Sequence, residues 1–417
     1  MRSGNGATGY QCFYIFEGGD GSMIQLSRAR NPYIIPSYSL TGDLLSYLKC
    51  GLQYRYANRG ELPPSKPVQL WFGEFIHAVM EEAYVRWNSG VSPSTFPWDW
   101  ESVIRPIEQE VYLRLAGRAL IPPRGLFCPG TPCQCPSGIP PGHKLLSSER
   151  AHSAIDTWGQ SLFPLISDAE VPLKALRELP ATARYRSEKY EVTGIADVIG
   201  SIKVSSAPQG NLLVRELYKQ LPDLAYQTTY EIIVDYKGTR RPTPKDPVWN
   251  HYANQIQTYA WLRGRQPGAA PVVAGIILFL NELVPSATDI KDLQSDIKKG
   301  QTDIMPEGVD RLAILNWRGG PLPTLSTALR EDRCLRLVPV SPTSVATSLE
   351  EFDRVVGEIE ESVHGESAGG GLVVSWASRP SGSLFEAPDK RTCDVCDHKY
   401  YCSLAGTFRT VPSAPRR

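Results

Sequence analysis

The sequence lacks any long apolar run, any excess of charge of one sign and any phosphate-binding loop of the GxxxxGK[ST] kind. The first absence excludes a transmembrane helix, which needs about 20 consecutive apolar residues. With 44 basic and 44 acidic residues the formal net charge is zero, so only a local basic groove would attract a polyanion. The third absence means that any unwinding of a nucleic acid must come from another protein.

Residues 1–11 are polar and lack the apolar centre of a signal peptide, so we expect a cytoplasmic protein. The hydrophobic content of 41% and the charged content of 21% are typical of a soluble globular protein with a sizeable core. The nine cysteines are an odd number. In a reducing compartment, cysteines at motif spacing indicate metal binding rather than disulfides.

Apolar periodicity predicts an alternation of helices and strands. The predicted helices are 37–56, 72–87, 249–263 and 344–363, and the predicted strands include 192–199, 231–237 and 271–283. This order favours an α/β fold with a mixed central sheet flanked by helices. We expect a loosely ordered lead-in at 1–30, one domain over 31–405 with a Pro- and Cys-rich insertion at 116–147, and a tail at 406–417.

Two of these strands carry isolated charged side chains. The strand 192–199 is apolar except near Asp197, and the strand 231–237 ends in Asp235 and Lys237. Because side chains alternate along a strand, Asp235 and Lys237 are expected on the same face. Two carboxylates on adjacent strands form a hard oxygen site suited to Mg²⁺, which can activate water for phosphodiester hydrolysis.

Asp197, Asp235 and Lys237 resemble the D…(D/E)-x-K core of the PD-(D/E)XK nuclease superfamily. The segment 71–77, which ends in His77, resembles the G-x-x-x-H motif of its RecB-like branch, and 255–259 resembles the Q-x-x-x-Y motif. The resemblance implies a restriction-endonuclease-like fold. It also implies site residues with these roles: metal ligands His77, Asp197 and Asp235, the catalytic cation Lys237, and the supporting pair Gln255 and Tyr259.

The activity that the resemblance implies is that of a deoxyribonuclease dependent on Mg²⁺ or Mn²⁺. Since no base-reading motif is present, sequence-independent cleavage is expected, with exonuclease action on single-stranded DNA or DNA ends. A helicase or integrase-type protein is the implied partner. The alternative is a catalytically silent DNA-binding or scaffold subunit of a repair, recombination or CRISPR-adaptation complex.

A second motif lies near the C-terminus, where Cys393, Cys396 and Cys402 have the spacing C-x₂-C-x₅-C. Cys50 is available as a fourth ligand. Four thiolates suit a zinc ion or an iron–sulfur cluster, and spacing alone does not separate the two. The motifs are similar to those of AddB-type subunits and CRISPR-adaptation exonucleases, which implies a [4Fe–4S] cluster that ties the two ends of the domain together.

Other polar features leave alternatives open. Cys128, Cys133 and Cys135 lie in the proline-rich insertion, where either a second zinc site or free thiols would fit the spacing. The segment 237–245 contains four cations, which suits phosphate capture or a solvated loop. Tyr252 and Trp261 fit base stacking or ordinary core packing.

Overall fold

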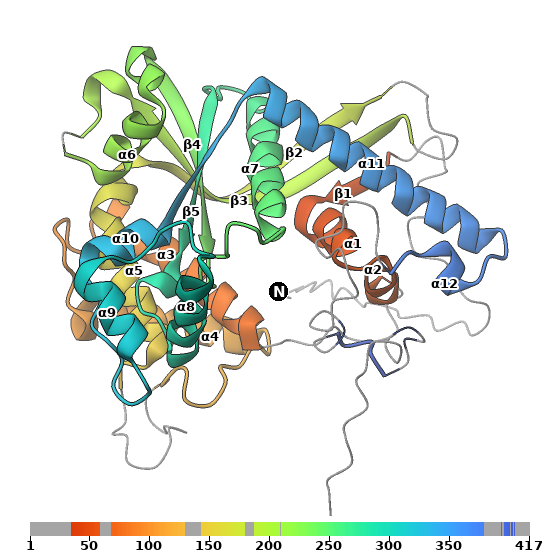
Figure 1. Cartoon of the computed structure of the whole chain (residues 1–417). Coiled ribbons are helices and arrows are strands. Elements are labelled where there is room, and N and C mark those ends of the chain that lie inside the picture. Colours follow the sequence, from red (N-terminus) through yellow and green to blue (C-terminus); the bar gives the residue numbers. More distant parts are fainter. Residues whose placement is uncertain are drawn as a thin grey trace, which may run out of the picture.

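The computed structural model describes residues 35–58, 68–129, 143–179, 187–208, 210–378, 393, 396–400, 402 and 404. The predicted lead-in, the predicted tail, Cys133 and Cys135 lie outside these residues. The described part is a mixed α/β structure built on one mixed sheet (Figure 1). Its strands are β1 (Ser37–Ser39), β2 (Ile166–Glu178), β3 (Lys189–Lys203), β4 (Thr229–Lys237), β5 (Val272–Phe279) and β6 (Leu335–Pro339).

The long strand β3 organises the sheet. Strand β2 pairs antiparallel with β3 along residues 189–200, so both remaining neighbours of β3 lie along its other edge. On that edge β1 pairs in parallel with residues 191–193, and β4 pairs antiparallel with residues 198–203. Between these two partners, residues 194–197 of β3 face a fork in the sheet. Beyond β4 the order continues through the parallel strand β5 to the antiparallel strand β6.

Helices cover both faces of the sheet (Figure 1). The principal helices of one layer are α3 (Val68–Asn88), α4 (Arg105–Gly117), α5 (Leu146–Leu162), α6 (Leu212–Gln220) and α10 (Thr327–Cys334). The other layer contains α1 (Ser46–Lys49), α2 (Gly51–Ala57), α7 (Val248–Gly264), α11 (Pro342–Ser367) and α12 (Leu372–Ser375). Helices α8 (Ala287–Lys299) and α9 (Gly308–Asn316) form a smaller cluster.

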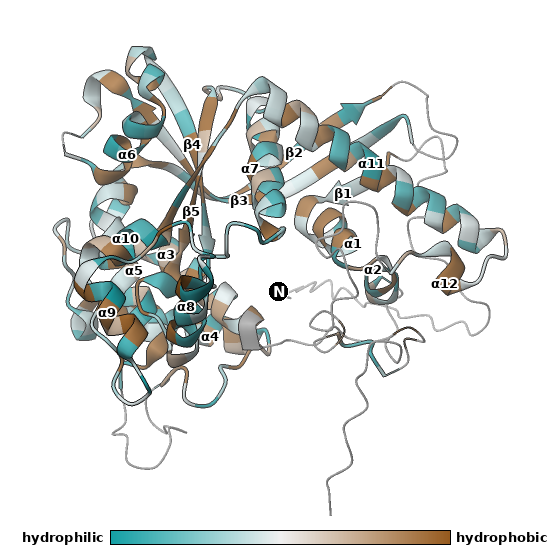
Figure 2. Cartoon of the chain, viewed as in Figure 1, coloured by the Kyte–Doolittle hydropathy of each residue, from teal (hydrophilic) through white to brown (hydrophobic). Residues whose placement is uncertain are grey.

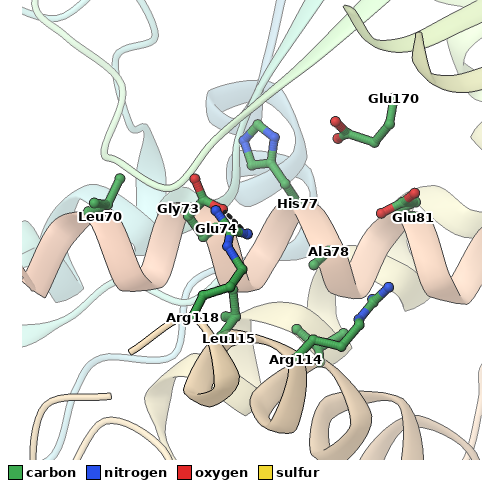
Figure 3. Close-up of a pocket in the computed structure, with 11 residues that line it drawn as sticks. Leu70, Gly73, Glu74, His77, Ala78, Glu81, Arg114, Leu115, Arg118 and Glu170 are labelled. Carbon is green, nitrogen blue, oxygen red and sulfur yellow. Dashed lines mark hydrogen bonds and ion pairs between the residues drawn. The ribbon is translucent and has the colours of Figure 1, made fainter. Parts of the chain in front are cut away.

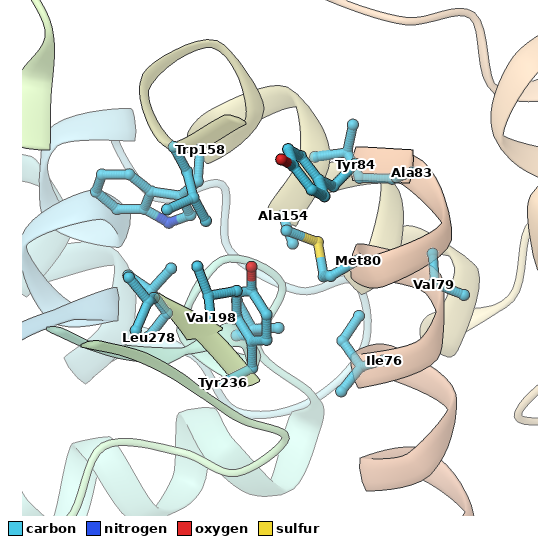
Figure 4. Close-up of a cluster of buried hydrophobic side chains, with 14 of the residues drawn as sticks. Ile76, Val79, Met80, Ala83, Tyr84, Ala154, Trp158, Val198, Tyr236 and Leu278 are labelled. Atoms are coloured by element: carbon cyan, nitrogen blue, oxygen red, sulfur yellow. The ribbon is translucent and has the colours of Figure 1, made fainter. Parts of the chain in front are cut away.

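The alternation of side chains along β4 separates the two cores. Tyr230, Ile232 and Val234 pack in the core against α3 and α5, whereas Ile233 packs in the core against α7. Figure 2 shows that the central strands are largely hydrophobic, whereas the outer helices carry hydrophilic residues. Figure 4 shows part of the first core, where the apolar face of α3 packs against α5 and the ends of β3, β4 and β5.

Most of the predicted elements are confirmed, including the strands within β3 and β4 and the helices within α3, α7 and α11. The predicted strand 271–283 is too long, because β5 ends at Phe279 and a 3-10 helix follows at Leu280–Glu282. The predicted helix at 37–56 is wrong in part. Its first residues form β1 because they pair with β3, and the helix is interrupted at Cys50, whose backbone is extended with φ of −169°. Among the described residues, no helix is both long and apolar enough to cross a membrane.

Candidate metal centre

Three side chains gather where α3 passes the fork in the sheet. One ligand atom each from His77, Glu170 and Asp197 can be chosen so that all three lie within 4.8 Å of one another. His77 Nδ1 lies 3.3 Å from Asp197 Oδ2. The other ring nitrogen, Nε2, is 2.8 Å from the carbonyl oxygen of Tyr236, which can only accept. Nε2 therefore carries a proton, and Nδ1 is the nitrogen directed at the carboxylates.

Asp197 lies where the pairing of β3 with β4 stops. The last paired residues are Val198 and Val234, and the amide of Tyr236 donates instead to Asp197 Oδ2 at 3.0 Å. Ala196 and Ile199 both pack in the core against α7 although they are three positions apart, so the alternation of faces slips at Asp197. This slip turns the carboxylate of Asp197 out of the ladder and toward His77.

The charge of Asp197 determines the protonation state of His77. Burial disfavours the charged imidazole, but the attraction of Asp197 and the hydrogen bond to it raise the pKa of His77 to about 9. Without a metal, His77 is therefore an imidazolium paired with Asp197 at neutral pH. A divalent cation bound at the same atoms would replace that proton.

Asp235, Lys237 and Gln255 form a second group beside the first. Asp235 is 2% exposed, and its Oδ1 accepts from Lys237 Nζ at 2.9 Å and from Gln255 Nε2 at 3.0 Å. Lys237 Nζ also donates to Gln255 Oε1 at 3.1 Å. Burial alone would lower the pKa of Lys237, but Asp235 and Asp197 raise it, so the ammonium is charged at neutral pH.

Two tyrosines of α7 differ in what they contact. The ring of Tyr252 lies under Lys237, with Nζ 5.0 Å from the ring centroid. Tyr259 instead hydrogen-bonds Gln255, and a Cβ on Gly194 of β3 would lie 2.6 Å from its ring. Tyr252 therefore positions the lysine, whereas Tyr259 supports Gln255 and fills the space that glycine leaves on β3.

A cavity of about 900 Å³ contains the site residues predicted from the sequence. It is lined, among others, by His77, Asp197, Asp235, Lys237, Gln255 and Tyr259. The fork in the sheet supplies further walls: Ser39 and Thr41 at β1, and residues 193–195 of β3. The structure thus brings all six predicted residues into one cavity, although they are spread over almost 200 positions of the chain.

Glu170 was missed by sequence reasoning. It lies in β2 opposite the slip at Asp197 and has a positive φ of 49°, a strained conformation for a residue other than glycine. Burial, followed by the charge of Asp197, raises its pKa to about 7. With His77 and Asp197 it forms a group that could hold a metal ion, whereas the sequence suggested Asp235 as the third ligand. No sequence motif marks Glu170, and only the folded backbone brings it beside the other two side chains.

The arginines predicted to suit phosphate capture are used elsewhere. Arg241 is 3% exposed and bonds to Asp303, while its amide donates to Glu282. Arg240 pairs with Asp296. Arg241 is therefore not part of a solvated loop, and both arginines hold the segment after Lys237 against α8 and the residues that follow it.

The four motif cysteines lie close enough together to repel one another as thiolates. Burial raises the pKa of Cys396 to about 11, and the charges of Cys50, Cys402 and Cys393 contribute to the rise. Cys50 is the N-cap of α2, where its sulfur accepts from the amide of Gln53 at 3.4 Å. Burial raises the pKa of the Cys50 thiol, and the hydrogen bonds from the amides of Gln53 and Leu52 partly oppose that rise. The thiolate is the form that binds metal. Cys128 is buried.

Comparisons with known proteins supply no family for this chain. No protein-family model matches the sequence. No curated protein gives a significant match.

Proposed function

We propose that this chain is a metal-dependent deoxyribonuclease with a restriction-endonuclease-like fold, which hydrolyses phosphodiester bonds in single-stranded DNA or at DNA ends. One observation carries the proposal. A histidine and two carboxylates converge at the same point of a cavity that also contains a charged lysine held by a third carboxylate. The resemblance to the PD-(D/E)XK superfamily supports the same conclusion.

The donor set fits Mg²⁺ or Mn²⁺. Adjacent ligands of an octahedral Mg²⁺ ion lie about 3 Å apart, because each bond is about 2.1 Å long. The separation of 3.3 Å between His77 Nδ1 and Asp197 Oδ2 is close to this value. His77, Asp197 and Glu170 would hold the ion, with Asp235 in the same cavity. When bound, such an ion acts as a Lewis acid toward the phosphate and lowers the pKa of a coordinated water.

The protein's own groups complete the chemistry. Lys237 is charged, so it acts as a cation that attracts the scissile phosphate or orients the attacking water, rather than as a base. Gln255 fixes both Asp235 and Lys237 through its amide, which keeps the ammonium at the edge of the cavity. Tyr252 limits its movement from the opposite side.

The test is a digestion assay with labelled single-stranded DNA and Mg²⁺ or Mn²⁺. We expect cleavage by the wild type and a loss of at least about a hundredfold in Asp235→Ala and Lys237→Ala, since each removes a charge from the reaction centre. Arg311→Ala, in an exposed residue of α9, is the matched control. Equal survival of the DNA with wild type and both site variants would favour the silent DNA-binding or scaffold subunit instead.

We also propose that Cys50, Cys393, Cys396 and Cys402 bind a [4Fe–4S] cluster. Their proximity to one another, with all four side chains partly buried, supports a shared metal. Zinc at the same sulfurs is the alternative. Anaerobically purified protein should be coloured, with visible charge-transfer absorption that Cys50→Ala reduces. A colourless protein containing one equivalent of zinc would exclude the cluster.

A further inference from the structure

A second cavity of about 530 Å³ adjoins the metal centre. It lies between α3 and α4 and shares three lining residues with the larger cavity: Glu74, His77 and Glu170. Figure 3 shows His77 and Glu170 in this cavity together with Arg114 of α4 and Arg118, which directly follows α4. A ligand with one group at the metal centre would therefore have room to extend past His77 into the space beside α4.

The walls of this second cavity combine apolar surface with cations. Leu70, Ala78 and Leu115 supply apolar side chains, and Arg114 and Arg118 supply two guanidinium groups. At Gly73 an added Cβ would meet no atom within 4 Å, so the glycine leaves open space on the α3 wall. An apolar wall beside arginines suits a nucleotide, whose base and sugar need apolar contact and whose phosphate needs bidentate donors.

The two arginines make ion pairs with carboxylates of α3. Arg118 lies 3.1 Å from Glu74, with 63% of its side chain exposed. Arg114 lies 3.8 Å from Glu82, a carboxylate that already pairs with Arg86 at 2.8 Å. An exposed pair such as Arg118–Glu74 contributes about 0–1 kcal/mol, so a phosphate could replace that carboxylate at little cost. The contact of Arg114 with Glu82 is long, so it also holds the guanidinium only loosely.

The acids of the cavity restrict where a phosphate can lie. Glu74 and Glu81 lie on α3 and line the same space, so the α3 side is negative. A phosphate is therefore favoured only on the α4 side, next to Arg114 and Arg118. This separation of charge favours one path for a polynucleotide, from the metal centre past His77 to the α4 side of the second cavity.

Building on the proposed nuclease function, we infer that the cavity between α3 and α4 binds the nucleotide adjacent to the scissile phosphate. Arg114 and Arg118 contact its phosphate, and the wall around Leu115 and Ala78 contacts its base and sugar. The metal centre then cuts a strand that occupies both cavities, and the second cavity favours a polynucleotide over a small phosphodiester.

The binding test uses fluorescein-labelled oligothymidylate and fluorescence anisotropy, with Lys237→Ala in every protein to prevent cleavage during the titration. The double variant Arg114→Ala/Arg118→Ala should bind about tenfold or more weakly. The slope of log affinity against log salt concentration should fall in magnitude by about 0.7 for each phosphate that the variant no longer neutralises. Arg114→Lys/Arg118→Lys should retain most of the slope because it retains the charge, and Arg311→Ala should match the parent.

A second measurement separates this inference from the proposed function. Protein with an intact Lys237 is tested with Mn²⁺ on bis(4-nitrophenyl) phosphate, which is too small to fill both cavities, and on single-stranded DNA. If the protein hydrolyses the reporter, but the DNA affinity and the salt slope are the same in both double variants as in the parent, the subsite is refuted and the proposed nuclease function stands. If neither substrate is hydrolysed, the proposed function itself fails. Circular dichroism of the lysine and alanine variants checks that each is folded.

Discussion

Replacing Arg241 by methionine tests whether the segment after Lys237 is a structural tether. The guanidinium is 2% exposed and donates to Asp303 at 2.9 and 3.0 Å, and to the carbonyl of Leu335 at 2.9 Å. Methionine would retain most of the apolar volume but leave Asp303 and the carbonyl without this donor. Removing one member of a buried ion pair costs about 3–5 kcal/mol, and we expect a loss within that range.

The assay is urea unfolding followed by tryptophan fluorescence, performed as a double-mutant cycle with Asp303→Asn. In the Asp303→Asn background the loss from Arg241→Met should be smaller by about 1–3 kcal/mol, because the charge partner is already gone. Lys245→Ala, in an exposed cation of the same segment, should cost less than about 0.5 kcal/mol. A loss below about 1 kcal/mol for Arg241→Met, equal in both backgrounds, would refute the tether and restore phosphate capture as the better account.

Three further predictions concern other parts of the fold. Burial raises the pKa of Glu108 from 4.5 to about 7. The contribution of the protonated carboxyl to stability is therefore full below pH 4.5 and is lost as the pH rises through 7. Glu108→Gln should therefore stabilise the protein by about 3 kcal/mol at pH 8 and by little at pH 4, as measured by urea unfolding. Tyr252→Leu should lower kcat for DNA cleavage about five- to thirtyfold, the equivalent of about 1–2 kcal/mol, whereas Tyr252→Phe keeps the ring under Lys237. Gly275→Ala should cost about 1–3 kcal/mol in a thermal or urea melt, because the new Cβ would overlap Ile256 of α7.

Each of these predictions has an outcome that would contradict it. An equal effect of Glu108→Gln at both pH values would mean that the carboxyl is not protonated by burial. Equal kcat values for the leucine and phenylalanine variants would remove Tyr252 from the positioning of Lys237. An unchanged melt of Gly275→Ala would show that β5 and α7 can separate without cost.

Local patterns in the sequence were sufficient to predict the direction of a side chain where it lies on a regular helix or strand. The alternation along β4 correctly puts Asp235 and Lys237 on one face, and the carboxylate and ammonium are 2.7 Å apart. His77 and Asp197, 120 positions apart, lie at 3.3 Å as the motif order predicted. Asp235 and Lys237 lie on a regular strand and His77 lies on a regular helix, so their directions follow from the repeat of those segments. The direction of Asp197 depends on the slip in β3 instead.

The features that the sequence did not predict depend on contacts between segments far apart in the chain. Strand β1 has three residues and exists because of β3, more than 150 positions away, so local helical spacing was misleading there. Glu170 depends on a backbone irregularity that forms only when β2 meets the slip at Asp197. Arg241 could not be assigned to the interior because its partner Asp303 lies 62 positions further along the chain.

The three-residue strand β1 gives the cysteines a connection to the metal cavity. Ser39 and Thr41 form part of the cavity wall, and the chain then runs through α1 directly to Cys50. A cluster bound by the four sulfurs, as proposed, would thus also anchor the short segment that closes one side of the fork. Loss of such a cluster by oxidation or chelation would release the Cys50 end of that segment, whereas Asp197 and Asp235 lie on paired strands of the sheet and do not depend on the sulfurs for their positions.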